Sequence, residues 1–123
     1  MASAGRILIV DDNAFLLEMV GSYVSRLGYE TDICRNGGEA WDLVQANPAI
    51  YTGALIDLQM PGMNGEELAR RILDSNASIR LVLMSGYPAE QSGIASLDAG
   101  RVTFLFKPFV PQELMAALAA FST

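Results

Sequence analysis

Short apolar runs alternate with longer amphipathic segments along the whole chain. In the segments between the runs, apolar residues recur every three or four positions, as they do on one face of a helix. The runs predict strands over residues 6–10, 30–34, 52–57, 80–85 and 102–106. The other segments predict helices from Asp12 or Asn13 to Leu27, over 37–46, from the residue after Asn64, over 88–97 and over 111–121. This alternation predicts a (βα)5 unit of the α/β class, with helices on both faces of a parallel sheet.

Residues at the helix boundaries support these predictions. Asp12 and Asn13 are both good N-caps, Asn64 can cap the helix that follows it, and Pro111 suits the first position of the last helix. The first helix is expected to bury one apolar face, made of Phe15, Leu16, Met19, Val20, Tyr23, Val24 and Leu27. The helix over 88–97 is the element expected to move, because Gly93 in its interior costs about 1 kcal/mol relative to alanine.

Four predicted strands end on residues with reactive or metal-binding groups. Asp11 and Asp12 follow the first strand, and Asp57 ends the third. Ser85 ends the fourth strand, and Lys107 follows the fifth. Open parallel sheets bind ligands beyond the carboxyl ends of their strands, which lie at one edge of the sheet. These side chains are therefore expected to form one site.

The composition narrows the chemistry that this site can perform. With 123 residues, of which 51% are hydrophobic, the chain is expected to form one domain over 1–123. The absence of histidine and the single cysteine, Cys34, exclude a zinc site and a Ser-His or Cys-His nucleophile. A net charge of −6 without a Lys/Arg cluster argues against nucleic-acid binding by this domain. Oxygen ligands remain, and they suit a hard cation such as Mg²⁺.

The apolar runs also bear on location. None approaches the length of a membrane span, and the first ten residues contain no apolar segment long enough for a secretory signal. We therefore expect a soluble, cytoplasmic domain that does not bind a membrane.

Three crowded carboxylates would need a counter-charge. At an effective dielectric of about 20, two like charges about 5 Å apart repel by roughly 3 kcal/mol. A six-coordinate Mg²⁺ would relieve this repulsion and leave room for a phosphate oxygen. An ionised aspartate beside such a metal can attack phosphorus and form an aspartyl-phosphate, with Lys107 and Ser85 available to the phosphoryl oxygens.

Taken together, these motifs resemble the receiver domain of two-component response regulators. The matching motifs, spread over essentially the whole chain, are Asp11-Asp12, Asp57 within Asp-Leu-Gln-Met-Pro-Gly-Met-Asn-Gly, Ser85-Gly86 and Lys107-Pro108-Phe109. The resemblance implies a flavodoxin-like sheet with the strand order 2-1-3-4-5. It also implies a cis peptide bond between Lys107 and Pro108.

The resemblance further implies a role for each residue of the site. Asp57 becomes the phosphoacceptor and Lys107 the partner of the phosphate. Mg²⁺ (or Mn²⁺) is bound directly by Asp12, by Asp57 and by the main-chain carbonyl of Gln59, while Asp11 acts mainly through water. The switch residues are Ser85, in place of the commoner threonine, and Phe104, in place of the commoner tyrosine.

These roles imply a signalling switch, which catalyses only its own phosphoryl transfer and dephosphorylation. The donor would be a histidine kinase or a histidine phosphotransfer protein, and the output would be read by a downstream effector. The expected docking faces are the helix ending at Leu27, or the surface formed by 88–97, 102–106 and 111–121. The sequence around Ser85-Gly86-Tyr87 is most similar to receivers attached to hybrid sensor kinases, and a single-domain regulator is equally compatible.

Three alternatives stay open on the sequence alone. A pseudo-receiver would keep the fold and bind proteins without phosphorylation, although all five site residues are present. An aspartate-nucleophile phosphatase usually carries Asp-x-Asp after the first strand, whereas this chain has Asp11-Asp12-Asn13. A flavodoxin-type flavin carrier shares the sheet order, but the acidic loop after the first strand would repel a flavin phosphate.

Overall fold

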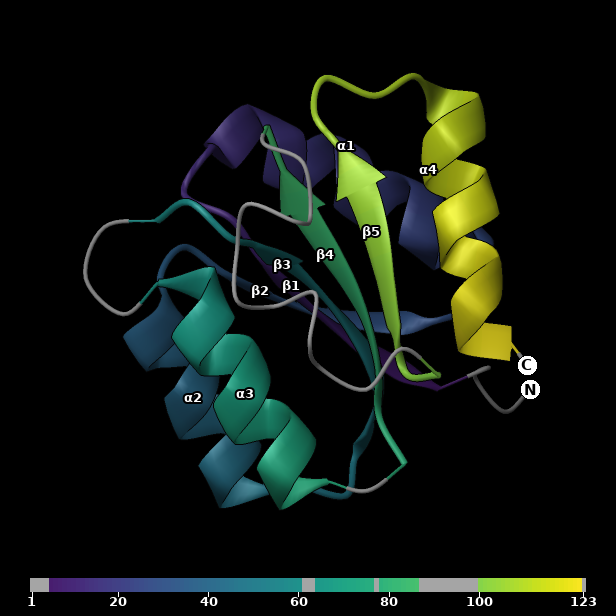
Figure 1. The fold of residues 1–123 in the computed structure, drawn as a ribbon. Coiled ribbons are helices and arrows are strands. Elements are labelled where there is room, and N and C mark those ends of the chain that lie inside the picture. Colours follow the sequence, from purple (N-terminus) through teal and green to yellow (C-terminus); the bar gives the residue numbers. More distant parts are fainter. Residues whose placement is uncertain (1–4, 61–63, 77, 87–99, 123) are drawn as a thin grey trace.

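A five-stranded parallel sheet between two layers of helices forms the centre of the molecule (Figure 1). The computed structural model describes residues 5–60, 64–76, 78–86 and 100–122. Its elements in chain order are β1 (Arg6–Val10), α1 (Ala14–Arg26), β2 (Glu30–Cys34), α2 (Gly37–Ala46), β3 (Tyr51–Asp57), α3 (Gly65–Ser75), β4 (Arg80–Ser85), β5 (Val102–Phe106), α4 (Pro111–Leu118) and a 3-10 turn (Ala119–Ser122). The predicted helix over 88–97 lies outside the described residues, so α4 is the helix predicted over 111–121.

The strand order is β2-β1-β3-β4-β5, which confirms the flavodoxin-like sheet. The register aligns the carboxyl ends of the strands, since Val10 pairs with Ile56, Asp57 with Met84 and Ser85 with Phe106. The residues that follow these strands therefore lie along one edge of the sheet.

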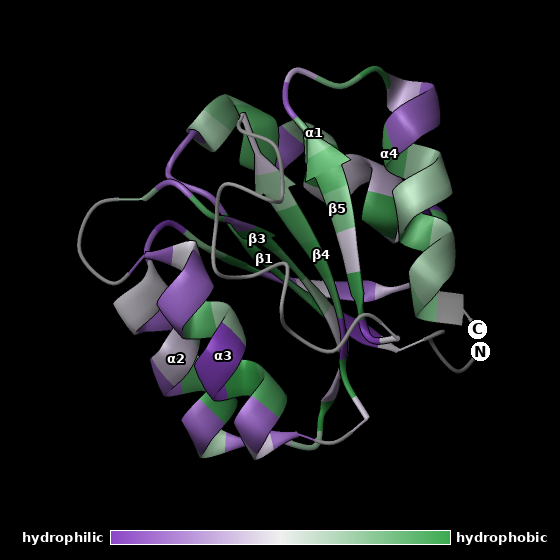
Figure 2. Ribbon diagram, in the orientation of Figure 1, coloured by the Kyte–Doolittle hydropathy of each residue, from purple (hydrophilic) through white to green (hydrophobic). Residues whose placement is uncertain are grey.

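The core has two halves because the side chains of each strand alternate between the two faces of the sheet. In β1, Leu8 and Val10 face α2 and α3, whereas Ile7 and Ile9 face α1 and α4. Figure 2 shows the strands as largely hydrophobic and the outward sides of α2 and α3 as largely hydrophilic. Near-continuous burial along the central strands is typical of a parallel sheet that is covered on both faces.

Three helices begin at asparagine N-caps. The side chains of Asn13, Asn36 and Asn64 each accept a hydrogen bond from the main-chain N–H three residues later. Before α4, the carboxylate of Glu113 accepts a hydrogen bond from the N–H of Val110 at 3.0 Å, with Pro111 in the first position. The helix predicted to run to Phe121 ends at Leu118 and continues as the 3-10 turn.

The predicted apolar face of α1 is wrong in part. Phe15 is 79% exposed and Leu27 is 40% exposed, while Leu17, left out of the prediction, is buried. The buried positions are Leu17, Val20, Gly21 and Val24, which follow the spacing of three and four residues. The apolar surface of α1 is therefore wider than the strip that packs on the sheet.

The length and the hydropathy of the helices determine whether one of them could cross a membrane. Of the helices in the described ranges, none combines the length and the apolar character that a bilayer span requires.

Candidate functional site

Three aspartates meet at the carboxyl edge of the sheet. Each of Asp11, Asp12 and Asp57 offers one carboxylate oxygen, and these three oxygens all lie within 4.8 Å of one another. Asp11 and Asp57 are buried, whereas Asp12 is exposed. The expectation that the ends of β1 and β3 bring these carboxylates together is confirmed.

The amino group of Lys107 lies between two of the carboxylates. Its Nζ is 2.9 Å from Oδ2 of Asp11 and 3.4 Å from Oδ2 of Asp57. The main chain holds the lysine in place, because its N–H donates to the carbonyl of Ser85 at 2.7 Å. The peptide bond between Lys107 and Pro108 is cis, as the sequence analysis predicted.

The surroundings of the buried Asp57 carboxyl group shift its pKa in opposite directions. Burial raises the pKa of its carboxyl group above the usual value, and the charge of Asp11 raises it further. The N–H of Gln59, which donates to Oδ1 of Asp57 at 3.0 Å, and the amine of Lys107 act in the opposite direction and lower the pKa. Lys107 contacts two of the three carboxylates, and a divalent cation bound among the three would offset the remaining negative charge.

Asp11 connects this site to α1. Its Oδ1 accepts a hydrogen bond from the N–H of Asn13 at 2.9 Å, while Oδ2 accepts from Lys107. The N-cap of α1 is Asn13, whose side chain accepts from the N–H of Leu16.

Gly65 shapes the loop after Asp57. Its φ is not in the left-handed region, and what the fold requires at this position is space. A Cβ at Gly65 would lie 2.1 Å from the main-chain oxygen of Asp57 and 2.6 Å from Cα of Leu58. The start of α3 therefore packs directly on the backbone that carries the central carboxylate.

The remaining predicted residues lie along the same edge or next to it. Ser85 is buried at the end of β4. Phe104 pairs with Leu83 in the ladder between β4 and β5 and is partly exposed. The side chain of Gln59 accepts a hydrogen bond from the N–H of Gly86 at 3.2 Å. Their placement agrees with the predicted roles, and the roles themselves stay predictions.

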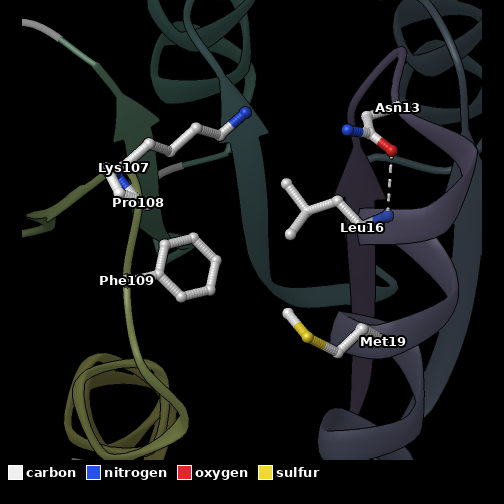
Figure 3. Close-up of a pocket in the computed structure, with 6 residues that line it drawn as sticks. All are labelled: Asn13, Leu16, Met19, Lys107, Pro108 and Phe109. Atoms are coloured by element: carbon white, nitrogen blue, oxygen red, sulfur yellow. Dashed lines mark hydrogen bonds between the residues drawn. The ribbon is translucent and has the colours of Figure 1, made fainter.

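A hollow of about 420 Å³ lies beside the carboxylates, between α1 and the loop after β5 (Figure 3). Leu16 and Met19 point from α1 toward Phe109, and Lys107 and Pro108 also line the hollow. A second hollow of about 290 Å³ on α1 is lined by Phe15, Glu18, Met19 and Ser22. The sequence predicted this helix as a possible docking face, but it wrongly placed Phe15 in the core.

Comparison with known proteins identifies the class to which this fold and site belong. The family model of the response regulator receiver domain matches residues 7–119, and the chain belongs to this family. The acidic site thus lies in a signalling module of two-component systems. Attachment to a hybrid sensor kinase stays a prediction.

Among individual relatives, the chain is 31% identical over 115 residues to the response regulator RppA of Synechocystis, an alignment that covers 94% of this chain and 49% of that protein. It is also 31% identical to the transcriptional regulatory protein ResD of Bacillus subtilis, over 94% of this chain and 47% of ResD. The chain therefore spans about half the length of the curated relatives it matches.

Solved structures agree on the fold. A CheY-like response regulator receiver domain protein from Methanospirillum hungatei is similar with a TM-score of 0.81 and 29% identity, over 95% of this chain and 92% of that chain. The response regulator TrrA from Thermotoga maritima, solved in complex with Mg²⁺-BeF, is similar with a TM-score of 0.78 and 26% identity, over 95% and 98% of the two chains.

Proposed function

We propose that residues 1–123 form one cytoplasmic receiver domain in which Asp57 accepts a phosphoryl group from a histidine kinase or a histidine phosphotransfer protein. The observation that carries this proposal is a buried carboxylate at the end of β3, with two further carboxylates within 4.8 Å and a lysine amine at 3.4 Å. An oxygen of Asp57 forms a bond to phosphorus as the bond from phosphorus to the donor imidazole nitrogen breaks. The imidazole then takes up a proton.

The donor set fits Mg²⁺ or Mn²⁺, which prefer carboxylate and carbonyl oxygens. Asp11, Asp12, Asp57 and the main-chain carbonyl of Gln59 are the groups that would hold the ion. When bound, the ion supplies positive charge for the phosphoryl oxygens. The Mg²⁺-BeF complex of TrrA supports this assignment.

Lys107 and Ser85 would act on the phosphoryl oxygens from the two neighbouring strands. The amine of Lys107 already contacts Asp57 and would move only a short way to contact an oxygen of the phosphoryl group. Phosphorylation adds about −1.5 to −2 charges at a buried, acidic position. The hydroxyl of Ser85 would then bond the new group, and with Phe104 it would pass the change on to β5 and α4, where an effector reads it.

The chemical test uses phosphoramidate, a small phosphoryl donor that needs no partner protein. With Mg²⁺, we expect the intact mass to rise by one phosphoryl group and hydroxylamine to remove that group, as it does from an acyl phosphate. Asp57→Asn should abolish the labelling. Asp42→Asn, which changes an exposed aspartate on α2, should not. Labelling that persists in Asp57→Asn would refute the acceptor assignment, and no Mg²⁺-dependent labelling or beryllofluoride binding would instead indicate a pseudo-receiver.

We further propose that the donor protein docks over the hollow beside Lys107. The apolar side chains of Leu16, Met19 and Phe109 face this hollow and offer a surface for another protein next to the acceptor (Figure 3). Phe15 extends the surface along α1. A donor bound there would lie at the same sheet edge as Asp57.

A further inference from the structure

The side chain of Gln59 connects the loop after β3 to the loop after β4. Its Oε1 accepts a hydrogen bond from the N–H of Gly86 at 3.2 Å. The main-chain N–H of the same residue donates to Oδ1 of Asp57 at 3.0 Å. One residue therefore touches both the central carboxylate and the first residue beyond β4.

The hydrogen bond between Gly86 and Gln59 comes one residue after the main-chain hydrogen bonds that connect the ends of the strands. The N–H of Leu58 donates to the carbonyl of Met84 at 2.9 Å, and the N–H of Lys107 donates to the carbonyl of Ser85 at 2.7 Å. These bonds hold the chain as far as Ser85, and the Gln59 side chain extends the connection by one residue. Gln59 is exposed, so its side chain can exchange this partner for water without burying an unpaired group.

Among the residues that the structure describes, other than the chain neighbours of Gly86, a Cβ built at Gly86 would come within 4 Å of one atom, Oε1 of Gln59, at 3.7 Å. The Gly86 N–H thus belongs to the edge that carries Asp57, and a neutral carboxamide oxygen occupies it. A charged acceptor forms a stronger hydrogen bond with an N–H group than a neutral one does.

We propose that Gln59 is a positioning residue that holds the Gly86 N–H in the unmodified protein and competes for it with the group that Asp57 acquires. This inference rests on the proposed function, because the competitor is a phosphoryl oxygen on Asp57. In the unmodified state, the carboxamide keeps the residue after β4 tied to the loop after β3. Once a phosphoryl oxygen takes over the N–H, that tie is released and Gly86 moves toward Asp57.

The test replaces Gln59 by methionine, which has a similar length and offers only a weak acceptor. Beryllofluoride with Mg²⁺ serves as the phosphoryl probe, because its binding does not depend on hydrolysis. We expect Gln59→Met to bind beryllofluoride about two- to tenfold more tightly than the wild type, the range that one net hydrogen bond represents. In the protein without the probe, the ¹⁵N–¹H resonance of Gly86 should shift and its hydrogen exchange should become faster.

The matched control is Gln45→Met, the same substitution at an exposed position of α2. Its affinity for beryllofluoride and its Gly86 resonance should equal those of the wild type. A merely structural role of Gln59 would lower both the midpoint temperature and the affinity, whereas the competition predicts a higher affinity together with a midpoint lowered by no more than the loss of one hydrogen bond. Unchanged or weaker binding by Gln59→Met would overturn the inference alone. No binding by the wild type would overturn the proposed function.

Discussion

At the scale of single residues, Asp57 makes the stability of the protein depend on pH. Folding raises the pKa of its carboxyl group, mainly through burial, so the folded chain holds the proton more tightly than the unfolded chain does. The stability from this group is fully present below the unfolded pKa and is lost as the pH rises through the raised folded pKa. At neutral pH, without a divalent cation, the ionised Asp57 is therefore a source of instability.

Asp57→Asn should for this reason stabilise the metal-free protein at neutral pH. We expect the midpoint temperature to rise by several degrees, since about 1 kcal/mol corresponds to roughly 4 °C in a domain of this size. The gain should shrink as the pH falls toward the unfolded pKa of an aspartate, and thermal unfolding followed by circular dichroism measures it. Asp42→Asn on the exposed side of α2 is the control. A lower midpoint for Asp57→Asn at neutral pH would contradict this account of the site.

Addition of Mg²⁺ should raise the midpoint temperature of the wild type, because an ion that binds only the folded state stabilises it. Asp57→Asn removes one charged ligand and should respond more weakly at the same concentration. The comparison is made by thermal unfolding over a Mg²⁺ titration. An equal response of the two proteins would place the ion away from the cluster of Asp11, Asp12 and Asp57.

A further prediction concerns the close packing of Gly65 against the backbone of Asp57. Gly65→Ala puts a Cβ against the backbone of Asp57, so the helix start or the loop must shift. Such overpacking typically costs about 1–3 kcal/mol, and here it would also displace the carboxylate and weaken Mg²⁺ binding. Denaturant unfolding and a Mg²⁺ titration measure the two effects.

Gly38→Ala is the matched control for this glycine. A Cβ there would lie 3.5 Å from the side chain of Asn36, an ordinary contact, and Gly38 lies within α2. Alanine in a helix is more stable than glycine by up to about 1 kcal/mol. Gly38→Ala should therefore be neutral or stabilising, and equal effects of the two substitutions would show that close approach is not what Gly65 provides.

Single residues also show where sequence reasoning reaches its limit. The positions of Asp11, Asp57 and Lys107 at one edge followed from strand ends, because parallel strands align their carboxyl ends. The close approach of Gly65 to Asp57 did not follow from the sequence. It depends on how the start of α3 packs against the backbone at the end of β3, which no local pattern specifies. The contact between Gln59 and Gly86 depends on a side-chain rotamer, which no sequence pattern specifies.

At the scale of elements, the C-terminal 3-10 turn fixes α4 to the sheet through Phe121. This ring is buried, packs edge-on against Tyr29 with centroids 6.3 Å apart, and lies where a Cβ of Gly53 would be. Phe121→Ala should cost about 3–5 kcal/mol, as is usual for a buried phenylalanine. Met115→Ala, at a position of α4 that is 38% exposed, should cost much less. Denaturant unfolding compares them, and equal losses would mean that the turn does not anchor the helix.

The elements themselves were largely predictable. The apolar runs gave the bounds of β2, β4 and β5, and asparagines gave the starts of α2 and α3, because strand length and N-cap chemistry are local properties. The local sequence does not determine which face of α1 packs on the sheet. Its apolar residues span more than one strip, and only packing on β1 and β2 decides that Leu17 is buried and Phe15 exposed.

At the scale of the whole molecule, the sheet separates two kinds of surface. The helices α2 and α3 cover one face and carry charged residues outward, including Arg70 and Arg71, which pair with Glu66 and Glu67. On the other face, α1 and the loop after β5 leave apolar side chains around the hollow beside Lys107 (Figure 3). An apolar surface next to a reactive carboxylate is suited to a protein that must bring a phosphoryl group there.

Phe15 tests whether this surface serves the donor protein. Phe15→Ala changes a side chain that is 79% exposed, so the midpoint temperature should stay the same. Transfer from a phosphotransfer protein that labels the wild type should slow about tenfold, the effect of losing one well-packed aromatic contact. Labelling by phosphoramidate should be unaffected, because that donor needs no docking surface. Leu43→Ala on α2, a partly exposed position on the opposite face, should change neither reaction. Equal slowing with both donors would instead assign Phe15 to the chemistry of Asp57, and an unchanged rate with the protein donor would move the docking site away from α1.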